Sequence, residues 1–146
     1  MSIDMIKLWF KKAKPNPTEK DLNVQLGCHL EEIVEMFDCM EGNDEFTDLL
    51  VDKCREYLAK LSYHLKSGAS VEITDREGML DSLCDQIVTA TGVGYMAGMG
   101  IVEGVERVNT SNFTKFDIVT GEPLFDANGK IKKGSNYEPP NLDGLY

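Results

Sequence analysis

The chain has 146 residues, of which 25 are acidic and 15 basic, so its net charge is −10 with both histidines neutral. Its length suits one domain, and an apolar content of 42% excludes a disordered chain, while no apolar run approaches the ~20 residues of a membrane span. The negative charge argues against a general phosphate-backbone binder but allows a phosphate enzyme whose carboxylates hold metal cations.

The first half of the chain predicts three helices. A short helix over about residues 3–12 precedes a Pro-Asn-Pro breaker. Thr18 is the expected N-cap of a second helix, because acidic residues follow it in the first turn. Apolar spacings of three and four continue this helix until Gly42, which suits a C-terminal cap. A third helix is expected over about residues 46–66.

The second half predicts two further helices and a tail. A fourth helix is expected from Asp75 to about residue 98, and a fifth over about residues 101–108. Asn128-Gly129 indicates a hairpin with a type I′ turn, which needs positive φ at both positions. We therefore expect an all-α fold, a four- to five-helix bundle with a C-terminal hairpin or extended tail. It forms a single domain over residues 1–146, with a helical body over 1–108 and a tail over 109–146.

The second predicted helix carries acidic residues within an apolar stretch. Glu32 and Glu35 are three residues apart, so they occupy adjoining rows and can reach one ion. Glu31 lies about 100° from Glu32, at the edge of that face. A solvated acidic face is the ordinary alternative for such a motif.

The fourth predicted helix repeats this arrangement. Asp81 and Asp85 are one turn apart on the same face, and Glu77 extends the row by another turn. Aspartate disfavours helix interiors because its side chain competes with the backbone. If this helix faced Glu32 and Glu35, the carboxylates would repel one another unless cations lay between them. Oxygen ligands select hard cations, so we expect Mg²⁺ or Mn²⁺.

These motifs resemble a known family. The E-x-x-E motif, the later aspartate motif and the tail segments 105–117 and 129–142 are similar to the all-α nucleoside triphosphate pyrophosphohydrolases. These are the MazG-like and phosphoribosyl-ATP pyrophosphohydrolase-like proteins, and phage and bacterial members are most similar. The resemblance covers about residues 20–142. The family has E-x-x-D in its second motif, so Ser82 stands at the usual glutamate position. Whether Asp81, Ser82 or Glu77 fills the fourth carboxylate position is left open.

The resemblance implies an enzyme that hydrolyses a (deoxy)nucleoside triphosphate to the monophosphate and pyrophosphate with two or three Mg²⁺ ions (or Mn²⁺). The implied metal ligands are Glu32, Glu35, Asp81 and Asp85, and the implied catalytic residues are Glu31 and Glu35. The implied nucleotide and phosphate contacts are Asn112, Lys115, Lys130, Lys133 and Tyr137. For the three residues of the hairpin region and beyond, an ordinary solvated surface position is the alternative.

The resemblance also suggests a substrate and a setting. A phage branch of the family converts (d)GTP to (d)GMP, and we take this as the first expectation. The alternatives are a housekeeping pyrophosphatase for dUTP, dCTP or damaged nucleotides, a non-catalytic nucleotide-binding homologue, which Ser82 suggests, and an acidic interaction protein. We expect a cytoplasmic homodimer or homotetramer (host cytoplasm if phage-encoded) that binds a nucleoside triphosphate but neither nucleic acid nor membrane.

Overall fold

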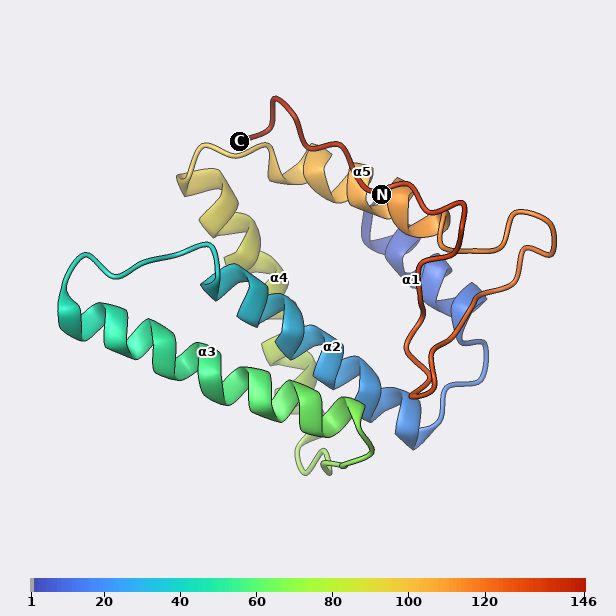
Figure 1. The fold of residues 1–146 in the computed structure, drawn as a ribbon, viewed down its shortest axis with the longest axis horizontal. Coiled ribbons are helices and arrows are strands. Elements are labelled where there is room, and N and C mark those ends of the chain that lie inside the picture. Colours follow the sequence, from blue (N-terminus) through green and yellow to red (C-terminus); the bar gives the residue numbers. More distant parts are fainter. Residues whose placement is uncertain (1) are drawn as a thin grey trace. The chain divides into compact units, whose positions relative to one another are not determined.

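A computed structural model describes residues 2–146 and confirms the all-α class (Figure 1). The described residues form five helices and no strand. The helices are α1 (Ser2–Ala13), α2 (Glu19–Phe37), α3 (Glu45–Lys66), α4 (Arg76–Met96) and α5 (Ile101–Phe113).

The chain divides into two compact units, which we describe separately. The α2–α3 unit comprises Asn16–Val71 and Phe125–Lys130. The α1–α4–α5 unit comprises the chain up to Pro15 together with Glu72–Leu124 and Ile131–Tyr146. The tail therefore contributes to both units, and its six residues 125–130 belong with α2 and α3.

The predicted N-cap at Thr18 is confirmed. Thr18 Oγ1 accepts a hydrogen bond from the backbone N–H of Asp21 at 3.2 Å, and the Asp21 carboxylate accepts from the backbone N–H of Thr18 at 2.9 Å. This reciprocal capping box satisfies two N–H groups that the helix itself leaves without partners. Asp75 caps α4 by accepting from the backbone N–H of Gly78 at 3.0 Å.

The predicted end of the second helix was wrong. Helix α2 ends at Phe37 with Asp38 as its C-cap, four residues before Gly42. The N–H groups of Cys39 and Met40 bond to carbonyls only three residues back, which tightens and closes the last turn. Gly42 is needed for another reason: a Cβ there would lie 2.1 Å from the backbone nitrogen of Asp48.

The fifth helix is longer than predicted, because it continues beyond residue 108 to Phe113. Its last residues are mostly poor helix formers, but tertiary hydrogen bonds hold them. Asn109 is buried, and its side-chain amide donates to the carbonyl of Ser2 at 3.1 Å. The hydroxyl of Ser111 donates to the carbonyl of Glu138 at 2.6 Å. Tertiary context thus overrides local propensity here.

The chain reverses at Asn128-Gly129, but the type I′ prediction was wrong. In the described residues only glycines have positive φ, and Gly129 (φ 85°) is the one in this turn. The backbone N–H of Gly129 donates to the carbonyl of Asp126 at 3.1 Å. The carboxylate of Asp126 also accepts from the backbone N–H of Asn128 at 2.9 Å, which holds Asn128 in an ordinary conformation.

The core of the α1–α4–α5 unit lies between α1 and the residues that follow α5. Trp9, Ala13 and Phe116 are buried, with Phe10, Phe113 and Ile131 packed around them. The rings of Trp9 and Phe116 are 5.9 Å apart between centroids. The indole N–H of Trp9 donates to the carbonyl of Asn112 at 2.7 Å, so the one polar atom of this buried ring is satisfied.

In the α2–α3 unit the two helices run side by side in opposite directions (Figure 1). They approach most closely at Gly27, where an added Cβ would lie 2.7 Å from Cγ of Lys66 and 2.9 Å from the carbonyl oxygen of Ser62. The buried hydroxyl of Ser62 donates to the carbonyl of Gly27 at 2.7 Å. This contact sets the register between the two helices.

Candidate functional site

Glu31, a predicted catalytic residue, is held by two lysines within the α2–α3 unit. Its Oε1 lies 2.6 Å from Nζ of Lys66 on α3, and its Oε2 lies 2.5 Å from Nζ of Lys130 in the tail segment. Both oxygens of one half-buried carboxylate therefore accept charge-assisted hydrogen bonds, which are stronger than neutral ones.

The protonation of Glu31 follows from these contacts. Burial raises the pKa of its carboxyl group, but the hydrogen bonds from Lys130 and Lys66 outweigh burial and leave the pKa below its ordinary value. Burial also lowers the pKa of Lys130, and the bond to Glu31 reverses this so that the pKa is raised. Glu31 is consequently an ionised carboxylate at neutral pH and a weaker base than an ordinary glutamate.

Local structure places both lysines. Lys66 reaches Glu31 because Gly27, one helical turn before Glu31, lets α3 approach α2 closely. Lys130 follows the turn at Asp126, whose carboxylate accepts from the backbone N–H of Lys130 at 3.0 Å. Lys66 was not predicted from the sequence, since it stands 35 residues from Glu31 and only the helix register brings them together.

The other two predicted acidic residues of α2 are more exposed than Glu31. Glu32 and Glu35 are exposed. Neither carboxylate forms an ion pair or a hydrogen bond within the described part of its unit, although the backbone carbonyl of Glu35 accepts from the thiol of Cys39 at 3.3 Å. Two acidic side chains therefore stand beside the lysine-held Glu31, exposed to solvent.

The predicted aspartates belong to the other unit. Asp81, Asp85 and Glu77 are exposed on α4, and the backbone carbonyl of Asp85 accepts from the hydroxyl of Thr89 at 2.8 Å. Across residues 2–146, no three His, Cys, Asp or Glu side chains form a group that could hold a metal ion by themselves. Each unit contributes its own pair of predicted ligands.

Four of the five predicted nucleotide contacts belong to the α1–α4–α5 unit, and three of them lie around one ring. Nζ of Lys115 lies 5.9 Å from the ring centroid of Tyr137, and Nζ of Lys133 lies 4.9 Å from the same ring. Lys115 also lies 5.7 Å from the ring centroid of Trp9. Asn112 contacts this group only through its backbone carbonyl, which accepts the hydrogen bond from the indole N–H of Trp9. Lys130 belongs to the α2–α3 unit instead.

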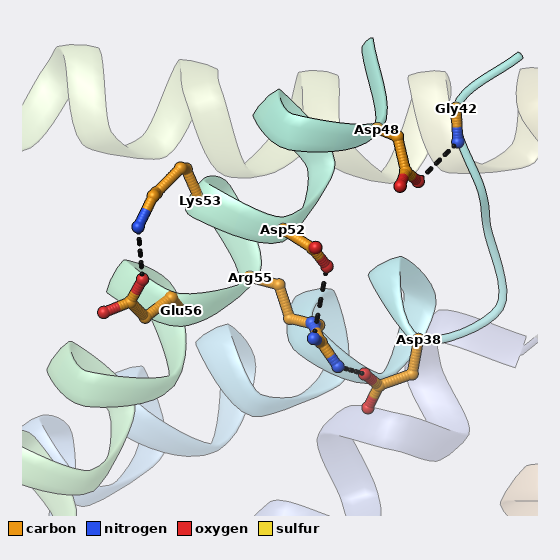
Figure 2. Close-up of polar contacts among 7 residues, drawn as sticks. All are labelled: Asp38, Gly42, Asp48, Asp52, Lys53, Arg55 and Glu56. Atoms are coloured by element: carbon orange, nitrogen blue, oxygen red, sulfur yellow. Dashed lines mark hydrogen bonds and ion pairs between the residues drawn. The ribbon is translucent and has the colours of Figure 1, made fainter. Parts of the chain in front are cut away.

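A second acidic region lies where α2 ends and α3 begins. It surrounds an open hollow of about 710 Å³ that six carboxylates and one guanidinium line. Arg55 joins Asp38 at 3.0 Å and Asp52 at 3.2 Å, and Asp48 accepts from the backbone N–H of Gly42 at 3.0 Å (Figure 2). Asp44 caps α3, and the hydrogen bonds from Thr47 and Phe46 keep the pKa of its carboxyl low. Four of the six carboxylates here therefore have structural partners.

Comparison with known proteins adds no relative. No protein-family model, no curated protein sequence and no solved structure matches this chain. No helix in the described part of the chain is long and apolar enough to cross a membrane. The resemblance to the all-α pyrophosphohydrolases therefore stays a prediction that rests on the motifs of the sequence.

Proposed function

We propose that this protein is a Mg²⁺-dependent nucleoside triphosphate pyrophosphohydrolase. Water would be added between the α- and β-phosphates, which gives a nucleoside monophosphate and pyrophosphate. One observation carries the proposal: within five residues of α2, two lysines hold the carboxylate of Glu31, while Glu32 and Glu35 are exposed and have no cationic partner in the described part of their unit.

The acidic pairs suit magnesium. Mg²⁺ usually binds through one or two carboxylates, keeps several waters and takes its remaining ligands from substrate phosphates. A site of this kind needs no group of three protein ligands, so the absence of one in residues 2–146 is compatible with the proposal. Glu32 and Glu35 would hold metal in one unit, and Asp81 and Asp85 in the other. When bound, the ion would polarise phosphoryl oxygens and lower the pKa of a bound water.

The state of Glu31 suggests a division of roles. A carboxylate whose pKa lies below its ordinary value is a poor proton acceptor. We therefore assign Glu31 to positioning Lys66 and Lys130, and we assign the proton-accepting role to Glu35, which has no cation on its carboxylate. Lys115 and Lys133 would offset negative charge on the substrate phosphates.

The direct test is pyrophosphate release from a panel of ribo- and deoxynucleoside triphosphates with Mg²⁺. We expect release from at least one of them, with dGTP and GTP first, and we expect EDTA to stop it. Glu35→Gln should abolish release while the helical circular dichroism spectrum stays intact. Glu41→Gln, which changes an exposed glutamate in the loop after α2, is the matched control and should stay active.

The outcomes separate the alternatives. Full activity of Glu35→Gln would remove the metal-site assignment on α2. Nucleotide binding without any turnover would favour a non-catalytic homologue. The absence of both would overturn the proposal.

We also propose that the protein assembles with copies of itself through α4. Val88 is 67% exposed, Leu80 65% and Met96 86%, and Gly94 is the only buried residue of this helix. Within its unit α4 packs only against α5, where Gly94 meets Ile101. Several exposed apolar side chains on one helix mark a surface that another molecule commonly covers. We propose that a second copy of this chain covers these residues, in line with the expected homodimer or homotetramer.

A further inference from the structure

In the α1–α4–α5 unit, three lysines contact neighbouring aromatic rings. Lys12, near the end of α1, places its Nζ 4.1 Å from the ring centroid of Phe116. Phe116 packs on Trp9, and Lys115 lies over the other ring of that pair. Through Tyr137 the series reaches Lys133. Each of the three ammonium groups thus contacts a ring that this series connects to the other two.

Two lysines of this series, Lys12 and Lys133, differ from those of the α2–α3 unit. There, Lys53 and Lys60 both pair with Glu56, and Lys66 and Lys130 both pair with Glu31. By contrast, Lys12 and Lys133 are exposed and contact aromatic rings, with no carboxylate paired to them in the described part of their unit. A ring face attracts a cation without neutralising it, so the positive charge stays available to an anion.

Helix α1 adds to this charge. Together with Lys14 it carries four lysines and one aspartate, in a chain whose net charge is −10. The N-terminal helix also lies outside the region of family resemblance, which begins near residue 20. Nothing in the motifs assigns it a role beyond packing.

We infer that Lys12 binds substrate phosphate together with Lys115 and Lys133, so that α1 is part of the ligand site. The ligand in this inference, the triphosphate group of a nucleotide, is taken from the proposed function, on which the inference therefore rests. The rings fix the three ammonium groups, which lowers the entropy that flexible lysines would otherwise lose on binding an anion. These residues would not contact the nucleobase.

Trp9 provides the measurement, because it is the only tryptophan of the chain and lies within this set of rings. We would titrate the whole protein with inorganic tripolyphosphate in the presence of Mg²⁺ and follow tryptophan fluorescence. We expect saturable binding, and a Kd about tenfold higher for Lys12→Ala, the loss typical of one charged hydrogen bond. Lys12→Arg keeps the cation and should restore binding to within about threefold of the wild type.

Lys11→Ala is the matched control. Lys11 also lies in the last turn of α1. Its removal takes away the same favourable interaction between a cation and the helix dipole, but leaves the contacts with the aromatic rings in place. Equal Kd values for the two alanine variants, or no binding by the wild type, would overturn the inference. Tighter binding of a single-stranded DNA oligonucleotide than of tripolyphosphate would also overturn it. Pyrophosphate release, measured separately, distinguishes the two proposals: binding that depends on Lys12 in a protein that releases none would leave this inference standing and remove the proposed activity.

Discussion

Glu31 and Lys130 are 99 residues apart in the sequence, and their side chains lie 2.5 Å apart. The turn that ends at Lys130 is thereby anchored to the middle of α2. The same carboxylate also receives Lys66, so one acidic side chain joins α2, α3 and the tail segment of the α2–α3 unit. Replacing Glu31 should therefore lower the free energy of unfolding, apart from any effect on catalysis.

The two lysines should contribute unequally to stability. The side chain of Lys66 is 19% exposed and that of Lys130 40% exposed, so water screens the second pair more. We expect Lys66→Ala to lower the free energy of unfolding by about 1–3 kcal/mol and Lys130→Ala by less than about 1 kcal/mol. Urea unfolding measures both. Lys60→Ala, which breaks a well-exposed pair with Glu56, is the control, and a larger loss there would contradict the ranking.

Stability should depend on pH through Glu31. Its folded-state pKa lies below the ordinary value of 4.5, so its contribution is fully present above that value and is lost as the pH falls through the folded-state pKa. We expect the wild type to be more resistant to urea than Glu31→Gln at pH 6. The difference should shrink progressively as the pH is lowered from 5 towards 2. A difference that stayed constant over this range would show that the ion pairs do not stabilise the fold.

Lys115→Ala should impair turnover if Lys115 contacts the substrate phosphates. Loss of one charged hydrogen bond predicts a decrease in kcat/KM equivalent to about 1.5–3 kcal/mol. Steady-state pyrophosphate release would measure it, with Lys20→Ala on α2 as an exposed control. Unchanged kinetics would remove Lys115 from the site.

The N-cap of α2 should be worth a measurable amount of stability. Thr18→Ala removes the hydroxyl that accepts from the backbone N–H of Asp21 and donates to its carboxylate, which predicts a loss of about 1 kcal/mol. Thr18→Ser keeps the hydroxyl and should stay close to the wild type. Thermal unfolding followed by circular dichroism compares the three proteins, and equal midpoints would argue against the cap.

Assembly through α4 should be sensitive to a single charge. We expect Ile87→Glu, at a position 51% exposed on α4 and away from Asp81 and Asp85, to lower the molar mass measured by light scattering during size-exclusion chromatography, because burial of an unpaired carboxylate is costly. Val119→Glu is the control, since Val119 is 89% exposed in the tail. A wild-type protein that runs as a monomer would refute the proposed assembly directly.

Local signals account for the parts of the fold that were predicted. The cap at Thr18 and the breaker before α2 act within a few residues, and the structure confirms them. The length of α5 was missed because it depends on bonds from Asn109 and Ser111 to distant backbone groups. The conformation of Asn128 was missed because the carboxylate of Asp126 decides it.

In the candidate site too, features that depend on nearby residues were predicted, and features that depend on distant contacts were not. Spacing along one helix indicated that Glu31, Glu32 and Glu35 lie near one another, and they do share one stretch of α2. Spacing could not indicate that Lys66 would neutralise Glu31, since that depends on the register of α2 against α3. The metal and nucleotide roles stay predictions, which the experiments above address.

That register has an evolutionary consequence. The backbone approach at Gly27 leaves no room for a side chain, because an added Cβ would meet the stem of Lys66 at 2.7 Å. A substitution at Gly27 would therefore displace the lysine that neutralises Glu31, without altering any charge itself. Because the backbone carbonyl oxygen of Ser62 also lies 2.9 Å from that Cβ, related sequences should keep glycine at position 27 whichever residue stands at position 66.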